Sequence, residues 1–88
     1  MTRVVNRDVE LYDVYIGRPS KWGNPHGPPQ NTTLQARLDC IKAYEIWIKG
    51  NQELLADLHE LKGKRLGCYC KPKPCHGDVL VELVEKYC

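Results

Sequence analysis

The pattern of hydrophobic and polar positions predicts three short β-strands: β-branched and aromatic residues indicate the first two, and alternation with a period of two indicates the third. The predicted strands are residues 3–6, 12–17 and 64–70. In the last strand, the alternation places Leu66, Cys68 and Cys70 on one face and Tyr69 on the other. Small residues that face the core are the stronger interpretation of Cys68 and Cys70.

Apolar residues recur at helical spacing in three other segments. Thr32 with Gln35 three residues later has the form of a capping box, so a long helix is expected to begin near Thr32 or Thr33 and to end at Gly50. Asn51 can cap a second, shorter helix. The last helix is expected to begin between Cys75 and Asp78, because a carboxylate in the first turn complements the positive end of the helix dipole.

The order of these elements predicts an α/β fold: one small domain, residues 1–88, with a short, largely parallel sheet packed by about three helices. The strands at 12–17 and 64–70 are expected to be parallel neighbours. The segments that follow them, an irregular loop over Arg18–Pro25 and a turn over Lys71–Asp78, would then leave the same edge of the sheet. Ligands of open α/β sheets bind at that edge.

Charge and composition limit the binding partners, the cellular location and the cysteine chemistry that we expect. The 88 residues carry a net charge of only +2, which is too small to indicate nucleic acid by itself. Between Lys62 and Lys73, however, lie five basic residues and no acidic one. No apolar run is long enough to span a membrane and no secretory signal begins the chain, so a cytoplasmic location is expected. The odd number of cysteines, five, favours reduced thiols over a disulfide scaffold.

The turn after the third strand is the strongest candidate for chemistry. Cys75 precedes a helix and has basic neighbours, which favours a reactive thiolate, although an unreactive residue at the helix entry is an equal alternative. His76 could act as an acid, a base or a phosphate contact, and Asp78 could orient it or simply cap the helix. Gly77 would let a ligand approach the backbone. Lys71 and Lys73 are expected to contact an anion.

The irregular loop after the second strand offers groups that suit phosphate or carboxylate recognition. These are Arg18, Ser20, Lys21 and Asn24. Trp22 could stack on a base or sugar, or it could anchor the loop in the core, which is the commoner role of a loop tryptophan.

Zinc binding is the alternative for the same turn. Three cysteines and a histidine are suitable donors, and the candidate set is Cys68, Cys70, Cys75 and His76. The spacing fits a zinc site poorly, because two side chains that alternate along one regular strand lie roughly 6–7 Å apart, and because the paired C-x-x-C motifs of common zinc sites are absent.

Two long motifs identify a resemblance that covers nearly the whole chain. They are VYIGRPSKWGNP at residues 14–25 and GCYCKPKPCHGDVL at residues 67–80. Both resemble the family called domain of unknown function 4326, which occurs in bacteria and bacteriophages. The resemblance implies a bacterial or phage protein, located in the host cytoplasm if it is phage-encoded. It also implies importance, without a known role, for Arg18, Ser20, Lys21, Asn24, Cys75, His76 and Asp78.

These observations favour a domain that binds a phosphate-bearing ligand, such as a nucleotide or a nucleic-acid end. The expected site is a crevice between the Arg18–Pro25 loop and the Cys75–Asp78 helix start. The site could support transferase or hydrolase chemistry, and whether the protein is an enzyme stays open. The alternatives are a zinc-stabilised, non-catalytic module that contacts nucleic acid or protein, and a phage effector that binds a host protein.

Overall fold

The computed structural model describes residues 2–18, 20–25, 33–69 and 74–88. In chain order, its elements are the strands β1 (Arg3–Asn6) and β2 (Val14–Tyr15), the helices α1 (Leu34–Lys49) and α2 (Gln52–Asp57), a short 3₁₀ helix η1 (Leu58–Leu61), the strand β3 (Arg65–Cys68) and the helix α3 (His76–Tyr87). The fold is α/β, as the sequence predicts.

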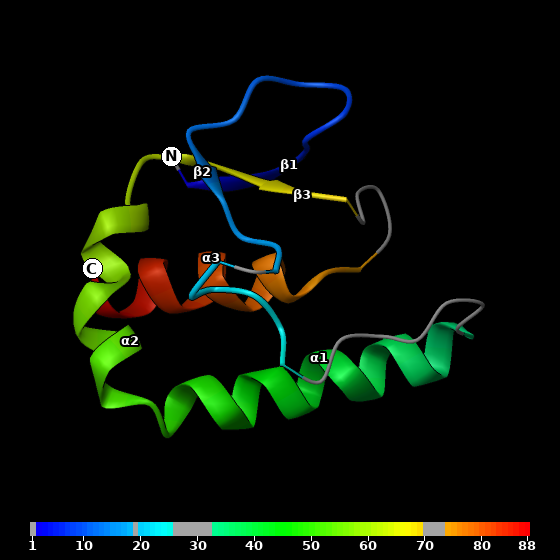
Figure 1. The fold of residues 1–88 in the computed structure, drawn as a ribbon. Coiled ribbons are helices and arrows are strands. Elements are labelled where there is room, and N and C mark those ends of the chain that lie inside the picture. Colours follow the sequence, from blue (N-terminus) through cyan, green and yellow to red (C-terminus); the bar gives the residue numbers. More distant parts are fainter. Residues whose placement is uncertain (1, 19, 26–32, 70–73) are drawn as a thin grey trace.

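The three strands form one parallel sheet in the order β1-β3-β2. The predicted neighbours β2 and β3 do pair in parallel, with Val14 opposite Leu66. Strand β1 occupies the other side of β3, where Val4 is opposite Leu66. Because all strands run the same way, their carboxyl ends meet at one edge of the sheet, and the chain leaves that edge toward both predicted loops (Figure 1).

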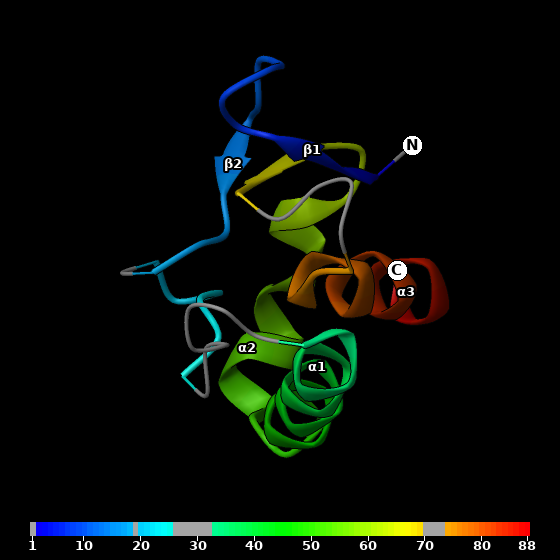
Figure 2. The same ribbon diagram turned by 90° about the vertical axis from the view of Figure 1, so that its right-hand side faces the viewer.

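All helices lie on one side of the sheet (Figures 1 and 2). Helix α3 packs directly against β1 and η1, and α1 packs against α3 and α2 on the side away from the sheet. The core fills the space between these layers with residues that include Ile16, Tyr44, Leu66 and Leu80, each fully buried. Burial of this apolar surface is the main force that holds such a small domain together.

Local signals set the helix boundaries. The hydroxyl of Thr33 accepts a hydrogen bond from the amide of Ala36 at 3.1 Å and starts α1, whereas Thr32 lies outside the described residues. Asn51 caps α2 through the amide of Leu54. Gly63 has φ +74°, a left-handed conformation that favours glycine, and it turns the chain from η1 into β3.

Two expectations from the sequence need correction. The strands are shorter than predicted: β2 covers Val14–Tyr15 and β3 ends at Cys68. The long helix is also less completely packed than its apolar spacing indicates, since Leu34 and Leu38 are 62% and 42% exposed. The spacing of apolar residues shows which side of a helix faces the core. It does not show how far along the helix the neighbouring elements extend.

Among the described residues, no helix combines the length and the apolar character that crossing a membrane requires.

Candidate metal centre

The start of α3 has a complete N-terminal cap. Cys75 is the N-cap residue, and its thiol sulfur accepts a hydrogen bond from the amide of Gly77 at 3.4 Å. The carboxylate of Asp78 accepts one from the backbone amide of Cys75 at 3.1 Å. Asp78 therefore has the capping role that the sequence offered as the alternative to a catalytic one, and its catalytic role stays a prediction.

Gly77 allows a close approach between the helix and the sheet. A Cβ atom at this position would lie 2.7 Å from Cδ1 of Ile16 and 2.8 Å from Cγ2 of Val4. Both distances are far below ordinary van der Waals contact. The space beside this glycine, which the sequence suggested for a ligand, is occupied by side chains of the protein itself.

The ring of His76 is held in a defined orientation. Its Nε2 lies 2.8 Å from the carbonyl oxygen of Ile16, which follows β2. A carbonyl can only accept, so Nε2 carries the proton, and in the neutral ring Nδ1 is left with a lone pair. That Nδ1 lies 3.6 Å from Sγ of Cys75. The edge-to-face ring of Tyr44, with its centroid 4.9 Å away, packs against the imidazole.

Three potential metal ligands converge at this point. The donor atoms of Cys68, Cys75 and His76 lie within 4.8 Å of one another, and all three residues are buried. Cys68 comes from the end of β3 and the other two from the start of α3, so the turn brings together donors that are several residues apart. Cys70, the fourth member of the set predicted from the sequence, lies outside the described residues.

The distances fit a tetrahedral zinc site with little rearrangement. Zn–S bonds of about 2.3 Å and Zn–N bonds of about 2.0–2.1 Å place neighbouring sulfur and nitrogen donors about 3.6 Å apart and two sulfurs about 3.8 Å apart. The Cys75–His76 distance of 3.6 Å already has this value. The hydrogen bond from Nε2 to a backbone carbonyl is also the usual support of a metal-bound histidine.

Tyr44 closes the cluster from the side of α1. It is fully buried, and its hydroxyl donates a hydrogen bond of 2.8 Å to the carbonyl oxygen of Trp22. Burial raises the pKa of Tyr44 well above its ordinary value, and the nearby charge of Cys75 adds to the shift. The phenol therefore stays neutral and acts as a fixed hydrogen-bond donor that ties the Arg18–Pro25 loop to the helices.

In the Arg18–Pro25 loop, Trp22 and Lys21 make contacts within the protein that differ from the ligand contacts that the sequence suggested. Trp22 is only 2% exposed, so it anchors the loop, and little of its ring is open to a stacking base. Lys21 points to α2 and η1, where it pairs with Asp57 and Glu60 at 2.9 Å each. Hydrogen bonds to Glu60 and Asp57 raise the pKa of Lys21.

The remaining loop residues separate into two environments. Asn24 is 5% exposed and lies at the cluster, whereas Arg18 is exposed. The hydroxyl oxygen of Ser20 is buried and has no hydrogen-bond partner within the described part of the chain. Lys71 and Lys73, which the sequence predicts at an anion, lie outside the described residues.

A narrow cavity shows that the two predicted loops do meet. Its lining includes Asn24 from the first loop, Cys75 and His76 from the start of α3, and Arg37 and Cys40 from α1. The cavity has a volume of about 20 Å³, enough for roughly one water molecule or a small ion. A nucleotide does not fit this space. Sequence reasoning missed Arg37 and Tyr44, because nothing in a regular helical pattern distinguishes a site residue from a core or surface residue.

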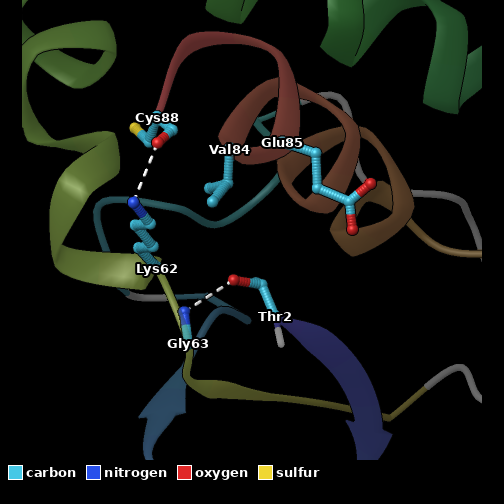
Figure 3. Close-up of a pocket in the computed structure, with 6 residues that line it drawn as sticks. All are labelled: Thr2, Lys62, Gly63, Val84, Glu85 and Cys88. Atoms are coloured by element: carbon cyan, nitrogen blue, oxygen red, sulfur yellow. Dashed lines mark hydrogen bonds between the residues drawn. The ribbon is translucent and has the colours of Figure 1, made fainter.

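A wider cavity of about 310 Å³ lies at the opposite end, by the amino ends of β1 and β3 (Figure 3). Its polar groups are largely satisfied by one another. Lys62 donates to the carbonyl of Cys88 at 2.9 Å, and the amide of Gly63 donates to the hydroxyl of Thr2 at 2.8 Å. These bonds close the end of the sheet against the end of α3, which indicates a structural role.

The described residues thus form a small parallel α/β domain with a buried cysteine–histidine cluster at the carboxyl edge of its sheet. The chain belongs to the family described as "domain of unknown function (DUF4326)", which it matches over residues 2–86.

Similar proteins come from viruses. An uncharacterised 12.4 kDa protein of enterobacteria phage T4 is 40% identical over 87 residues, and the match covers 98% of this chain and 80% of the phage protein. An uncharacterised protein of Acanthamoeba polyphaga mimivirus is 34% identical over 103 residues, covering 93% of this chain and 76% of the viral protein. No solved structure matches.

Proposed function

We propose that this protein is a zinc-stabilised domain whose metal is held by Cys68, Cys75 and His76. The observation that carries the proposal is the convergence of their three buried donor atoms within 4.8 Å. Thiolate and imidazole donors in this combination suit zinc better than magnesium or calcium, which prefer oxygen. The orientation of His76 by the carbonyl of Ile16 supports it, because Nδ1 faces Cys75.

A zinc ion would give this edge of the domain a crosslink that the apolar core does not supply. The proposed ligands connect the end of β3 to the start of α3, and the hydrogen bond from His76 extends the connection to the end of β2. Small domains bury a limited fraction of their surface and are often stabilised by a metal. The metal thus serves as a structural element, and binding to a partner takes place elsewhere on the domain.

Burial favours this function over covalent catalysis at Cys75. Its thiol and the His76 ring resemble a nucleophile and its base, with 3.6 Å between Sγ and Nδ1. Cys75 is only 1% exposed, however, and the adjoining cavity of about 20 Å³ admits a single small ion. A substrate the size of a nucleotide could not reach the sulfur without rearrangement of the surrounding residues.

Native mass spectrometry of protein purified without added metal tests the proposal. We expect one zinc ion per chain, which is lost on denaturation. Cys75→Ser should abolish zinc retention and lower the melting temperature, because metal binding is coupled to folding. The matched control is Cys88→Ser, which makes the same change at an exposed position. A metal-free wild-type protein that stays equally stable in a strong chelator would contradict the proposal.

The predicted fourth ligand can be tested in the same way. Replacement of zinc by cobalt gives a visible spectrum whose thiolate charge-transfer intensity rises with the number of bound sulfurs. If Cys70 is a ligand, Cys70→Ser should reduce that intensity, and Cys88→Ser should serve as the control that leaves it unchanged, because Cys88 is exposed.

A second candidate function is recognition of a phosphate-bearing ligand between the two loops, with the chemistry expected of Cys75 and His76. The observation that favours it is the shared cavity, where Asn24 and Arg37 line the same space as these two residues. Titration calorimetry with inorganic phosphate and with AMP tests it. Binding that is lost in Arg37→Gln and retained in Arg3→Gln would support this function, and heat changes no larger than dilution would contradict it.

A further inference from the structure

The helix-free face of the sheet carries an ordered group of aromatic rings. Strand alternation and register direct Tyr15, Gly67 and Val5 to one face, opposite to the face on which Leu66 and Val4 contact the helices. Tyr69 continues β3 on the same face and Arg7 continues β1. Tyr12 comes from the connection between β1 and β2, which passes over this side of the sheet (Figure 1).

These side chains contact one another closely. The ring centroids of Tyr12 and Tyr15 are 6.3 Å apart, and those of Tyr15 and Tyr69 are 6.2 Å apart with an edge-to-face arrangement. The guanidinium carbon of Arg7 lies 4.5 Å from the centroid of Tyr69 and 5.2 Å from that of Tyr15. We call Arg7, Tyr12, Tyr15 and Tyr69 the tyrosine–arginine cluster.

The backbone beneath the cluster holds the rings in place. A Cβ atom on Gly67 would lie 2.6 Å from Cγ of Tyr12, so the glycine in the central strand makes room for the ring to lie on the sheet. The hydroxyl of Tyr15 donates a hydrogen bond of 3.1 Å to the carbonyl of Arg18. The cluster is therefore preorganised, and a ligand that uses it loses little side-chain entropy on binding.

The cluster is also accessible. Tyr69 is 55% exposed and Tyr12 is 41% exposed, although aromatic rings of this size are strongly favoured in a core. Exposed aromatic side chains that pack against one another in this way, tilted or edge to face, are typical of a binding surface.

Among Arg3, Arg7 and Arg65, Arg7 makes the longest contact with a carboxylate and is the cation that the cluster offers to an anionic ligand. Arg3 pairs with Glu10 at 3.0 Å, and Arg65 makes hydrogen bonds to both carboxylate oxygens of Asp13 at 3.2 Å. Arg7 has a longer contact, 3.7 Å, with its neighbour Asp8. Its guanidinium lies among the tyrosine rings, and a guanidinium in that position can pair with a phosphate while the rings stack on bases.

We propose that the tyrosine–arginine cluster binds single-stranded nucleic acid. Exposed aromatic side chains on a sheet, together with a cation that follows the backbone, form the usual surface for unpaired bases. A duplex does not offer the faces of its bases, so it could use only the cation. The cluster also lies at the carboxyl ends of the strands, the edge at which parallel α/β sheets bind nucleotides. The proposal does not depend on a metal at Cys68, Cys75 and His76.

Fluorescence anisotropy with labelled single strands of about ten nucleotides, a length within the range that such surfaces cover, tests the proposal. We expect binding of the single strand at low salt and much weaker binding of the matching duplex. Tyr69→Ala should weaken binding by roughly 5- to 150-fold, the range measured for loss of one base–aromatic stack. Tyr69→Phe should retain most of the affinity, since the ring and not the hydroxyl stacks.

Two further variants test whether the strand binds at this surface. Arg7→Gln should weaken binding and reduce its salt dependence by about one phosphate contact. Leu11→Ala is the control, because Leu11 is 80% exposed on the same connection but has no aromatic ring that could stack on a base. Failure of the wild type to bind, equal binding of duplex and single strand, or a larger effect of Leu11→Ala than of Tyr69→Ala would overturn the proposal. The last outcome would point to a protein partner instead.

Discussion

Replacement of Gly77 by alanine tests whether the contact between α3 and the sheet is as close as the structure shows. Alanine is the better helix former by about 1 kcal/mol, so at an ordinary helical position the substitution would stabilise the protein. Here the added methyl group would lie 2.7 Å from Ile16 and 2.8 Å from Val4. Each contact must lengthen by about 1 Å to reach normal carbon–carbon separation.

The expected cost follows from that crowding. Inserting a methyl group into a packed core costs about 1–3 kcal/mol, and the gain in helix propensity offsets about 1 kcal/mol of it. A net destabilisation of up to about 2 kcal/mol remains, which corresponds to a fall in melting temperature of up to about 16 °C for a domain of this size. Ile16 also accepts the hydrogen bond from His76, so its displacement should weaken metal binding as well.

Thermal and urea unfolding, followed by circular dichroism, measure the effect. Gly50→Ala is the matched control, because Gly50 ends α1 with a negative φ that alanine also adopts (φ −89°, ψ −2°) and the nearest atom to its added Cβ is 3.6 Å away. We expect Gly50→Ala to be neutral or to stabilise the protein by a few tenths of a kcal/mol up to about 1 kcal/mol. If Gly77→Ala is as stable as Gly50→Ala, the close packing of α3 on the sheet is refuted.

Three other perturbations test separate parts of the structure. Tyr44→Phe should destabilise the protein by about 1–3 kcal/mol, because it leaves the buried carbonyl of Trp22 without its donor, and a two-state urea melt measures this loss. Hydrogen bonds from Arg65 lower the pKa of Asp13 to about 2. The stabilising contribution of that carboxylate is therefore present above its ordinary pKa and is lost as the pH falls through about 2. The melting temperatures of wild type and Asp13→Asn should differ at pH 7 and converge near pH 2. A difference that stays constant with pH would contradict the ion pair. Thr33→Ala should cost about 1 kcal/mol through loss of the helix cap, whereas an unchanged melting temperature would show that α1 does not depend on it.

Local chemistry made much of the fold predictable. Short runs of β-branched and aromatic residues located β1 and β2, the order of the elements predicted the parallel pair of β2 and β3, and the capping residues located the starts of α2 and α3. These features depend on neighbours within a few positions in the chain, and such neighbours are visible in a sequence.

The site was less predictable, because its geometry comes from contacts between distant segments. The spacing of Cys68 and Cys70 along one strand argued against a zinc site, but the turn into α3 places Cys75 and His76 beside Cys68 instead. Lys21 was expected at an anion, yet it pairs with acidic residues 36 and 39 positions further along the chain. The tyrosine–arginine cluster went unnoticed because it needs the register of all three strands.

The central position of β3 sets the order in which this protein can fold. Strands β1 and β2 do not pair with each other; each pairs only with β3. Contacts between these regions span 52 and 61 positions in the chain, and such long loops must close before any ladder bond forms. During synthesis the first two strands therefore have no strand partner until β3 (Arg65–Cys68) has emerged. Cys68 ends β3, and Cys75 and His76 follow it by only a few residues, so sheet assembly and the proposed metal binding are expected to be completed together.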